Sequence, residues 1–251
     1  MLDPNEREQL YQGALLKKSG GLEFGEQLWQ AIRAELGEQP RQPPEGDFLE
    51  PLTRLRQRLS QPHWRPLSRQ FLSGLGLPVE EFFIDRFRLR GVAPGSHQIA
   101  AAAAAFYAHR DTWFANPQAQ INLWMPLHDV SQLDSFGFYP QYFAQAVAND
   151  SDRFDYEQFV SQGGFQNPNS RLCQPHWLEP SRPAAQPVHL KFGQLLLFSA
   201  AHLHATLPNV SPHIRFSIDV RLVHRRDHDQ GLGAPNLDNH SRGCVLADYT
   251  W

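Results

Sequence analysis

The sequence of 251 residues has few cysteines and no long hydrophobic segment. Its two cysteines, Cys173 and Cys244, are too few for a disulfide framework or a four-thiolate zinc site, and they suit a reducing cytoplasm. The longest apolar stretch, Ile99–Ala108, has about half of the ~20 residues that cross a bilayer. Residues 1–6 lack the basic and apolar regions of a signal peptide. We therefore expect a cytoplasmic protein that does not associate with membranes.

An excess of positive charge is also missing. The formal net charge is −3, from 23 basic and 26 acidic side chains, so we expect no nucleic-acid partner. A composition of 41% hydrophobic and 20% charged residues is that of a folded globular protein. What is abundant is histidine, with 12 residues, and proline, with 20. The histidines raise the question of a metal site, and the prolines predict many turns and loops. The expected partner is a small-molecule substrate, and nothing in the sequence indicates an oligomeric state.

Helical patterns come first along the chain, and strand patterns follow. Apolar residues near helical spacing predict helices in three segments: residues 5–35 (interrupted around Gly20 and Gly21), 48–59 and 70–77. β-Forming or alternating residues predict strands in four segments: residues 82–92, 117–126, 190–199 and 213–223. This order predicts an α+β fold that is mainly β, either a sandwich or a barrel with helices on one face.

The length fits a single domain over residues 1–251. Within it we expect a helical part over 1–80, a β core over 81–224 and a C-terminal tail over 225–251. Residues 140–189 carry mixed signals and several prolines, and they interrupt the core as a long insertion. Because so long a loop in a compact domain is usually functional, we expect this insertion to act as a lid.

Two of the predicted strands alternate strongly between apolar and polar residues. In residues 118–125 one face carries Ala, Ile, Leu and Met, and the other carries Gln, Gln, Asn and Trp. In residues 214–222 the polar face carries Arg, Ser, Asp and Arg. Such alternation fits a sheet whose polar face meets water. It equally fits a barrel whose apolar faces pack on the helices and whose polar interior holds a polar ligand.

Three residues form a candidate metal site. His109 and Asp111 lie two apart in an extended segment, which places both side chains on one side. His204 follows a predicted buried strand. A lone His-x-Asp is a weak signal, but two histidines and one carboxylate form the facial triad that binds Fe(II) and leaves three positions open. Arg215 and Ser217 share one strand face and offer a guanidinium fork and a hydroxyl to the far carboxylate of a 2-oxo acid.

This combined motif resembles the Fe(II)/2-oxoglutarate-dependent dioxygenases. Within them the chain looks most like the phytanoyl-CoA dioxygenase superfamily and its streptomycin-biosynthesis-type relatives. Three stretches carry the closer likeness: residues 109–127, 195–209 and 215–224. The resemblance covers roughly the C-terminal two thirds of the chain. It implies a double-stranded β-helix, which is a jelly-roll or cupin-like fold, with the N-terminal helices packed on the larger sheet.

The resemblance also implies a reaction. His109, Asp111 and His204 would bind Fe(II), while Arg215 and Ser217 would hold 2-oxoglutarate as the co-substrate. O2 would be consumed, succinate and CO2 released, and a small molecule of secondary metabolism hydroxylated. Related halogenases carry a small residue where this chain has the Asp111 carboxylate, so oxygen insertion or another hydrogen-abstraction outcome is expected here.

Four inward-facing or neighbouring residues have two interpretations each. Asn122 would contact 2-oxoglutarate or the metal-bound oxygen, or it is a hydrogen-bonded amide of the barrel interior. Trp113 and Trp124 would floor the substrate pocket, or they belong to the core. Arg221 would bind a substrate anion, or it forms an internal ion pair.

The choice of the second histidine is open. His202 competes with His204, because His202-x-His204 resembles the start of a cupin metal site, although the glutamate expected a few residues later is missing. The spacing to Arg215 in the family pattern favours His204. Two alternative functions remain: a cupin-type metalloprotein independent of 2-oxoglutarate, and a jelly-roll binding protein without catalysis.

Overall fold

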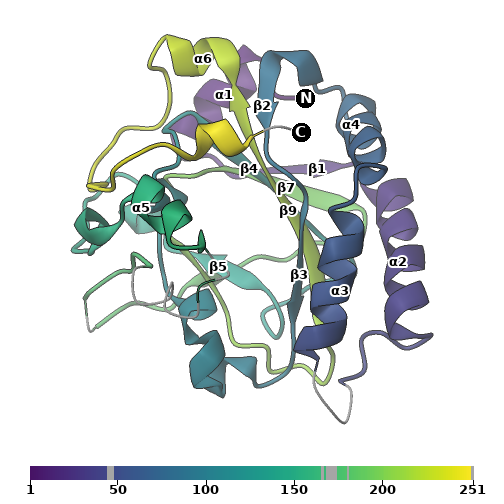
Figure 1. Ribbon diagram of the computed structural model, residues 1–251. Helices are drawn as coiled ribbons and strands as arrows, with labels where there is room; N and C mark the ends of the chain where they lie inside the picture. Colours follow the sequence, from purple (N-terminus) through teal and green to yellow (C-terminus); the bar gives the residue numbers. More distant parts are fainter. Residues whose placement is uncertain (44–47, 165–166, 168–173, 180, 250–251) are drawn as a thin grey trace.

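The computed structural model describes residues 1–43, 48–164, 167, 174–179 and 181–249. Cys173 and parts of the predicted insertion over 140–189 lie outside the described residues. The fold is α+β and mainly β, as the sequence predicts, with two antiparallel sheets (Figure 1).

The larger sheet has the strand order β1-β7-β4-β9-β2, and β3 also pairs with β9. Its strands are β1 (Leu16–Ser19), β2 (Phe82–Ile84), β3 (Arg88–Val92), β4 (Gln120–Pro126), β7 (Gln194–Ser199) and β9 (Arg215–His224). The smaller sheet has the order β6-β5-β8. Its strands are β5 (Phe136–Phe138), β6 (Gln186–Pro187) and β8 (His204–Thr206). In the larger sheet β4 lies between β7 and β9 and pairs with both.

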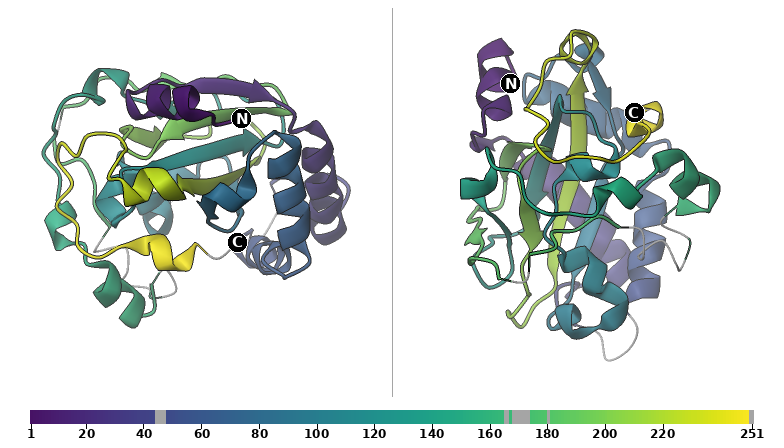
Figure 2. Two further views of the ribbon diagram at one scale, coloured as in Figure 1. Left: turned by 90° about the horizontal axis from the view of Figure 1, so that it is seen from above. Right: turned by 90° about the vertical axis from the view of Figure 1, so that its left-hand side faces the viewer.

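Among the described residues, six α-helices accompany the sheets: α1 (Pro4–Tyr11), α2 (Leu22–Leu36), α3 (Leu49–Leu59), α4 (Trp64–Gly74), α5 (Tyr156–Ser161) and α6 (Arg225–Asp229). The first begins where Asp3 accepts a hydrogen bond from the Glu6 amide and proline follows at the first helical position. The helices α2, α3 and α4 lie together on one flank, away from β5 and α5 (Figures 1 and 2). Within the described part of the chain, none of the helices has the length and apolar character needed to span a membrane.

One hydrophobic cluster joins these helices to the larger sheet. Its members include buried residues of α2, α3, β4 and β9: Leu28, Ile32, Leu52, Leu55, Ile121, Leu123, Phe216 and Ile218. Because strand side chains alternate, the residues between them point to the other side of the sheet. The polar residues of β4 and β9 therefore face the smaller sheet, where they form the wall of the candidate site.

A second cluster fills part of the space between the two sheets. Trp124 and Phe198 of the larger sheet pack there with Phe136 and Phe138 of the smaller one. The Trp124 and Phe136 rings meet edge to face, with centroids 4.6 Å apart. This contact ties the sheets together beside the polar wall.

The N-terminal part differs from the expectation of helices alone. Leu16–Ser19 forms β1, the edge strand that pairs with β7, and not part of a helix. The short segment alternates between half-buried and exposed residues. Its strand conformation depends on backbone pairing with β7, which the local sequence does not encode. The predicted strand over 82–92 is two strands, β2 and β3, separated around the buried Asp85, and α4 begins at Trp64 and not near residue 70.

Candidate active site

The structure brings together His109, Asp111 and His204, with ligand atoms that all lie within 4.8 Å of one another. The Nε2 atom of His109 is 3.6 Å from Oδ1 of Asp111. His109 and His204 pair through two backbone hydrogen bonds of 3.0 Å each. The backbone of Arg110 is extended, with φ −103° and ψ 141°, so the side chains on either side of it point the same way.

Both histidines have one ring nitrogen already in use. Nδ1 of His109 donates to the Tyr107 carbonyl at 2.7 Å, and Nδ1 of His204 donates to the His202 carbonyl at 2.9 Å. A carbonyl only accepts, so the hydrogen is on Nδ1 and the Nε2 lone pair is free for a metal. Burial, followed by the charge of His109, lowers the pKa of His204 to about 4, which keeps its imidazole neutral at pH 7.

The two oxygens of the Asp111 carboxylate have different surroundings. Oδ2 accepts a hydrogen bond of 2.6 Å from Nδ2 of Asn122. Oδ1 faces His109 and lies 4.0 Å from Nη2 of Arg221. Burial favours a raised pKa, but the contact with His109 and the positive charge of Arg221 outweigh it and hold the pKa of Asp111 below its usual range. One oxygen is thus fixed by an amide and the other is available to a cation.

A relay of hydrogen bonds connects this carboxylate to the C-terminal tail. The Tyr249 hydroxyl donates to Oε1 of Gln120 at 2.7 Å, and Nε2 of Gln120 donates to Oδ1 of Asn122 at 2.8 Å. The same hydroxyl lies 3.0 Å from Oδ1 of Asn116, whose Nδ2 donates to the Asp111 carbonyl at 2.7 Å. Contact of Asn122 with 2-oxoglutarate stays a prediction, whereas its bond to Asp111 is a feature of the structure.

Tyr249→Phe is expected to weaken Fe(II) binding by about 10-fold, in the range for groups that orient metal ligands. The change removes the hydroxyl that donates to Gln120, so the amides of Gln120 and Asn122 that hold the carboxylate of Asp111 lose their fixed orientation. Calorimetric titration with Fe(II) under argon measures the effect. Tyr156→Phe is the matched control, because its hydroxyl binds Asp248 of the same tail but is not in the relay. Equal metal affinity in Tyr249→Phe and wild type would contradict the relay.

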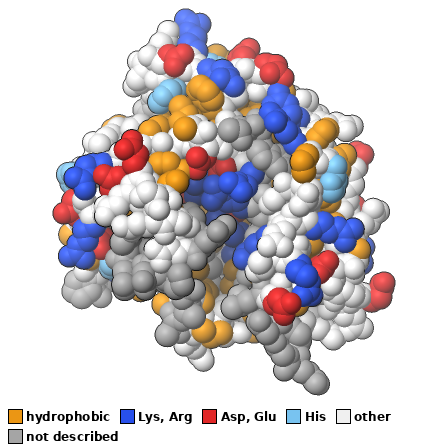
Figure 3. All heavy atoms as spheres, in the orientation of Figure 1, with side chains coloured by type: hydrophobic (Ala, Val, Ile, Leu, Met, Phe, Trp, Pro, Cys, Tyr) orange, Lys and Arg blue, Asp and Glu red, His pale blue; other side chains and the backbone are white. Residues whose placement is uncertain are grey.

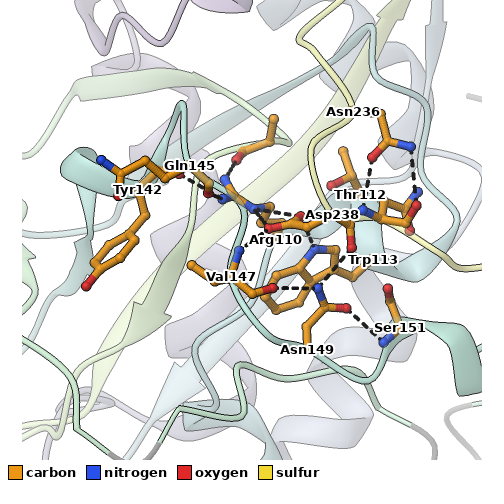
Figure 4. Close-up of polar contacts among 12 residues, drawn as sticks. Arg110, Thr112, Trp113, Tyr142, Gln145, Val147, Asn149, Ser151, Asn236 and Asp238 are labelled. Carbon is orange, nitrogen blue, oxygen red and sulfur yellow. Dashed lines mark hydrogen bonds and ion pairs between the residues drawn. The ribbon is translucent and has the colours of Figure 1, made fainter.

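Arg110, between the two predicted ligands, points away from them into a buried polar network (Figure 4). It pairs with Asp238 of the tail at 3.1 Å and donates to the carbonyls of Tyr142 and Gln145, each at 2.8 Å. Nε1 of Trp113 donates to the same Asp238 at 2.8 Å. The network fixes the segment that carries His109 and Asp111 to both the tail and the 140–189 insertion.

The two tryptophans have core positions. Trp113 is completely buried among Tyr139, Trp177 and Leu203, so it does not floor the pocket. Its indole nitrogen finds a partner in Asp238, which satisfies the one polar atom of the ring. Trp124 is inward-facing as expected, but it is packed against Phe136 between the sheets and is 5% exposed.

His202 is not brought to the metal-binding cluster. Its side chain is buried beside Phe143 and Phe138, with ring centroids 4.5 and 5.2 Å away. It lies in the turn before β8, so the shared parity of His202 and His204 does not place them on one face. Its contribution to the site is the carbonyl that holds Nδ1 of His204.

Arg215 and Ser217 lie on the polar face of β9, and both are buried. Within the described part of the chain, Nε and Nη1 of Arg215 and Oγ of Ser217 have no hydrogen-bond partner. Burial, followed by the charge of Arg90, lowers the pKa of Arg215 to about 10, so the side chain is still a cation at pH 7. A buried guanidinium without an acceptor is costly. An anionic ligand with a carboxylate group would supply the missing acceptors.

His128 holds the start of β9 beside Arg215. Its Nδ1 donates to the Asp129 carbonyl at 2.8 Å, and its Nε2 accepts from the Phe216 amide at 3.2 Å. The second bond requires a neutral ring. Burial is the main cause that lowers the pKa of His128 to about 4, and the charge of Arg41 adds to it.

We expect the free energy of unfolding of the metal-free protein to decrease as the pH is lowered, partly because of His128. Its folded-state pKa lies below the unfolded value of about 6.5, so protonation of the unfolded chain costs about 2 kcal/mol of stability between pH 7.5 and 5. His128→Gln keeps a donor and an acceptor without titrating. Urea unfolding at both pH values should show a smaller loss in this variant, with Asp134 and the cations Arg41 and Arg215 unchanged around it. An identical loss in wild type and variant would contradict the assignment.

Sequence reasoning missed two arginines of this wall. On β3, Arg88 pairs with Asp85 and Arg90 pairs with Asp219, through Nε–Oδ distances of 3.1 and 2.7 Å. The signal was present, since Arg-Leu-Arg alternates within the predicted strand over 82–92. Tyr249 and Asp238 have no comparable local signal. Figure 3 shows Lys and Arg side chains gathered in a hollow at the centre of the molecule's face.

The chain is similar to known proteins in both sequence and fold. The model of the phytanoyl-CoA dioxygenase family matches residues 46–217. Two solved structures of EvdO2 from Micromonospora carbonacea var. aurantiaca share the fold, each covering 89% of this chain and 91% of theirs. The complex with 2-oxoglutarate has a TM-score of 0.53 at 13% identity, and the other has 0.54 at 12%. No curated protein sequence matches the chain.

Proposed function

Since the chain belongs to the phytanoyl-CoA dioxygenase family of Fe(II)/2-oxoglutarate-dependent oxygenases, we propose that it hydroxylates a small molecule of secondary metabolism in the cytoplasm. The observation that carries this proposal is the convergence of His109, Asp111 and His204, with both Nε2 lone pairs and one carboxylate oxygen free. Two neutral imidazoles and one carboxylate are the donor set that suits Fe(II) in oxygenases.

The residues around this donor set fit the co-substrate. Arg215 and Ser217 would bind the far carboxylate of 2-oxoglutarate, which supplies acceptors for their unpartnered atoms. Fe(II) with 2-oxoglutarate would activate O2, releasing succinate and CO2 while a C–H bond of the substrate is oxidised. Asn122 and Gln120 keep Asp111 oriented, and His128 keeps the start of β9 in place. The two sheets are the walls of the proposed double-stranded β-helix, with the N-terminal helices outside the larger one.

We further propose that the insertion over 140–189 and the tail over 225–251 close the site against water. Support comes from Arg110, which donates to carbonyls of Tyr142 and Gln145 in the insertion and pairs with Asp238 in the tail. A dry site protects the protein from the oxidant that it uses. The β core, the insertion and the tail would then act as one domain.

Anaerobic titration with Fe(II) and 2-oxoglutarate tests the proposed function. We expect a weak visible charge-transfer band that needs both additions, followed by stoichiometric succinate once O2 and a substrate are admitted. Absence of the band in folded protein, together with no binding of 2-oxoglutarate by calorimetry, would overturn the proposal. The protein would then be a metal-binding or ligand-binding member of the family without this chemistry.

A further inference from the structure

Arg221 is in ion-pair contact with Asp111, one of the proposed metal ligands. It lies on the polar face of β9, opposite Asn122 of β4 in the strand register. Its Nη2 atom is 4.0 Å from Oδ1 of Asp111, and its side chain is 17% exposed. The guanidinium donates no hydrogen bond to any residue that the structure describes, although it has five N–H groups.

The neighbouring arginines each hydrogen-bond a carboxylate, whereas the one ion pair of Arg221 among the described residues is the 4.0 Å contact with Asp111. Arg88 is paired with Asp85, and Arg90 forms a two-point pair with Asp219. Neither of these carboxylates makes an ion pair with Arg221. The acidic group in contact with Arg221 is Asp111, through its Oδ1 atom. The same oxygen faces His109, and in the proposed function it binds the metal.

Position along the strand separates Arg221 from the co-substrate end of the site. Arg215 is six residues away on the same face of β9, which corresponds to about 20 Å along an extended strand. The far carboxylate of a 2-oxo acid held by Arg215 and Ser217 is therefore out of reach of Arg221.

We propose that Arg221 binds a carboxylate of the primary substrate, which makes the substrate a small organic acid. This inference rests on the proposed function and names the substrate class of the same site. The planar guanidinium fork matches a carboxylate through two parallel hydrogen bonds, and its position beside Asp111 places the acid group next to the metal ligands. The oxidised carbon then lies close to the carboxylate.

Carbon-13 acetate is a suitable probe, with acetamide as its neutral counterpart of the same shape. In anaerobic protein loaded with Fe(II) and saturated with 2-oxoglutarate, the paramagnetic metal should enhance acetate relaxation in a saturable way, and acetamide should show no saturable effect. Arg221→Gln should weaken acetate binding by 10-fold or more. Arg226→Gln is the matched control, because Arg226 is an exposed arginine of α6 and the charge change is the same.

The outcomes separate the two proposals. If the charge-transfer band forms but acetate binds equally to wild type and Arg221→Gln, the acid-binding role is wrong. The same conclusion follows if Arg221→Gln weakens only Fe(II) binding, since Arg221 is then a partner of Asp111 alone. If the band does not form in folded wild-type protein, the proposed function has failed and not the assignment of Arg221.

Discussion

Asp111→Ala is expected to abolish the Fe(II)–2-oxoglutarate charge-transfer band and the release of succinate. Loss of a group that only orients a metal ligand lowers metal affinity by about 10- to 100-fold. Loss of a ligand itself should therefore lower Fe(II) affinity by more than about 100-fold. The variant also leaves Arg221 without its only ion-pair contact among the described residues, which adds positive charge where the cation would bind. Fe(II) titration followed by calorimetry and visible spectroscopy measures both effects.

Asp152→Ala is the matched control, because it removes an exposed aspartate in the insertion. We expect it to keep the band and the metal affinity of wild type. Circular dichroism should show that both variants are folded. A band of normal intensity in Asp111→Ala would mean that the carboxylate is not a ligand, and the triad would have to be abandoned.

Arg215→Met should raise the dissociation constant of 2-oxoglutarate by about 100-fold, which is about 2.7 kcal/mol, within the range for losing one partner of a buried charge pair. Fe(II) affinity in the absence of 2-oxoglutarate should not change. The metal-free variant should be at least as stable as wild type, since the change removes a buried cation whose Nε and Nη1 lack acceptors. Calorimetry with 2-oxoglutarate and thermal unfolding give the two values.

Arg215→Lys provides a graded control, because it keeps the charge but loses the planar fork. Its affinity for 2-oxoglutarate should lie between those of wild type and Arg215→Met. A cupin-type centre independent of 2-oxoglutarate predicts that all three proteins turn over alike, and a binding protein without catalysis predicts no turnover in any. Unchanged affinity in Arg215→Met would assign the co-substrate carboxylate to another cation.

Much of the candidate site was readable from short-range patterns. His109-x-Asp111 needs only an extended residue between two ligands, and Arg110 has that conformation. The polar faces of β4 and β9 could be predicted because side chains alternate between the two faces of any strand, whatever the rest of the fold. Family likeness was also a property of the sequence, and the match over residues 46–217 confirms it.

Other features depend on contacts between distant parts of the chain. Leu16–Ser19 becomes a strand because the edge of β7 offers it partners, and the same few residues carry no decisive pattern alone. His202 and His204 have the same parity, yet the turn before β8 buries the first and presents the second. Trp113 could be assigned to the core only once Asp238 was seen to accept its hydrogen bond.

The sequence by itself determined the family of the protein, the candidate metal ligands His109, Asp111 and His204, and the prediction that Arg215 and Ser217 bind an anion. Tertiary structure decided how those groups are held. It joined Tyr249 to Asp111 through two amides, and it placed Arg221 4.0 Å from the carboxylate of Asp111. The physical reason is that residue type and spacing encode local geometry, whereas hydrogen bonding and charge pairing depend on which distant segments pack together.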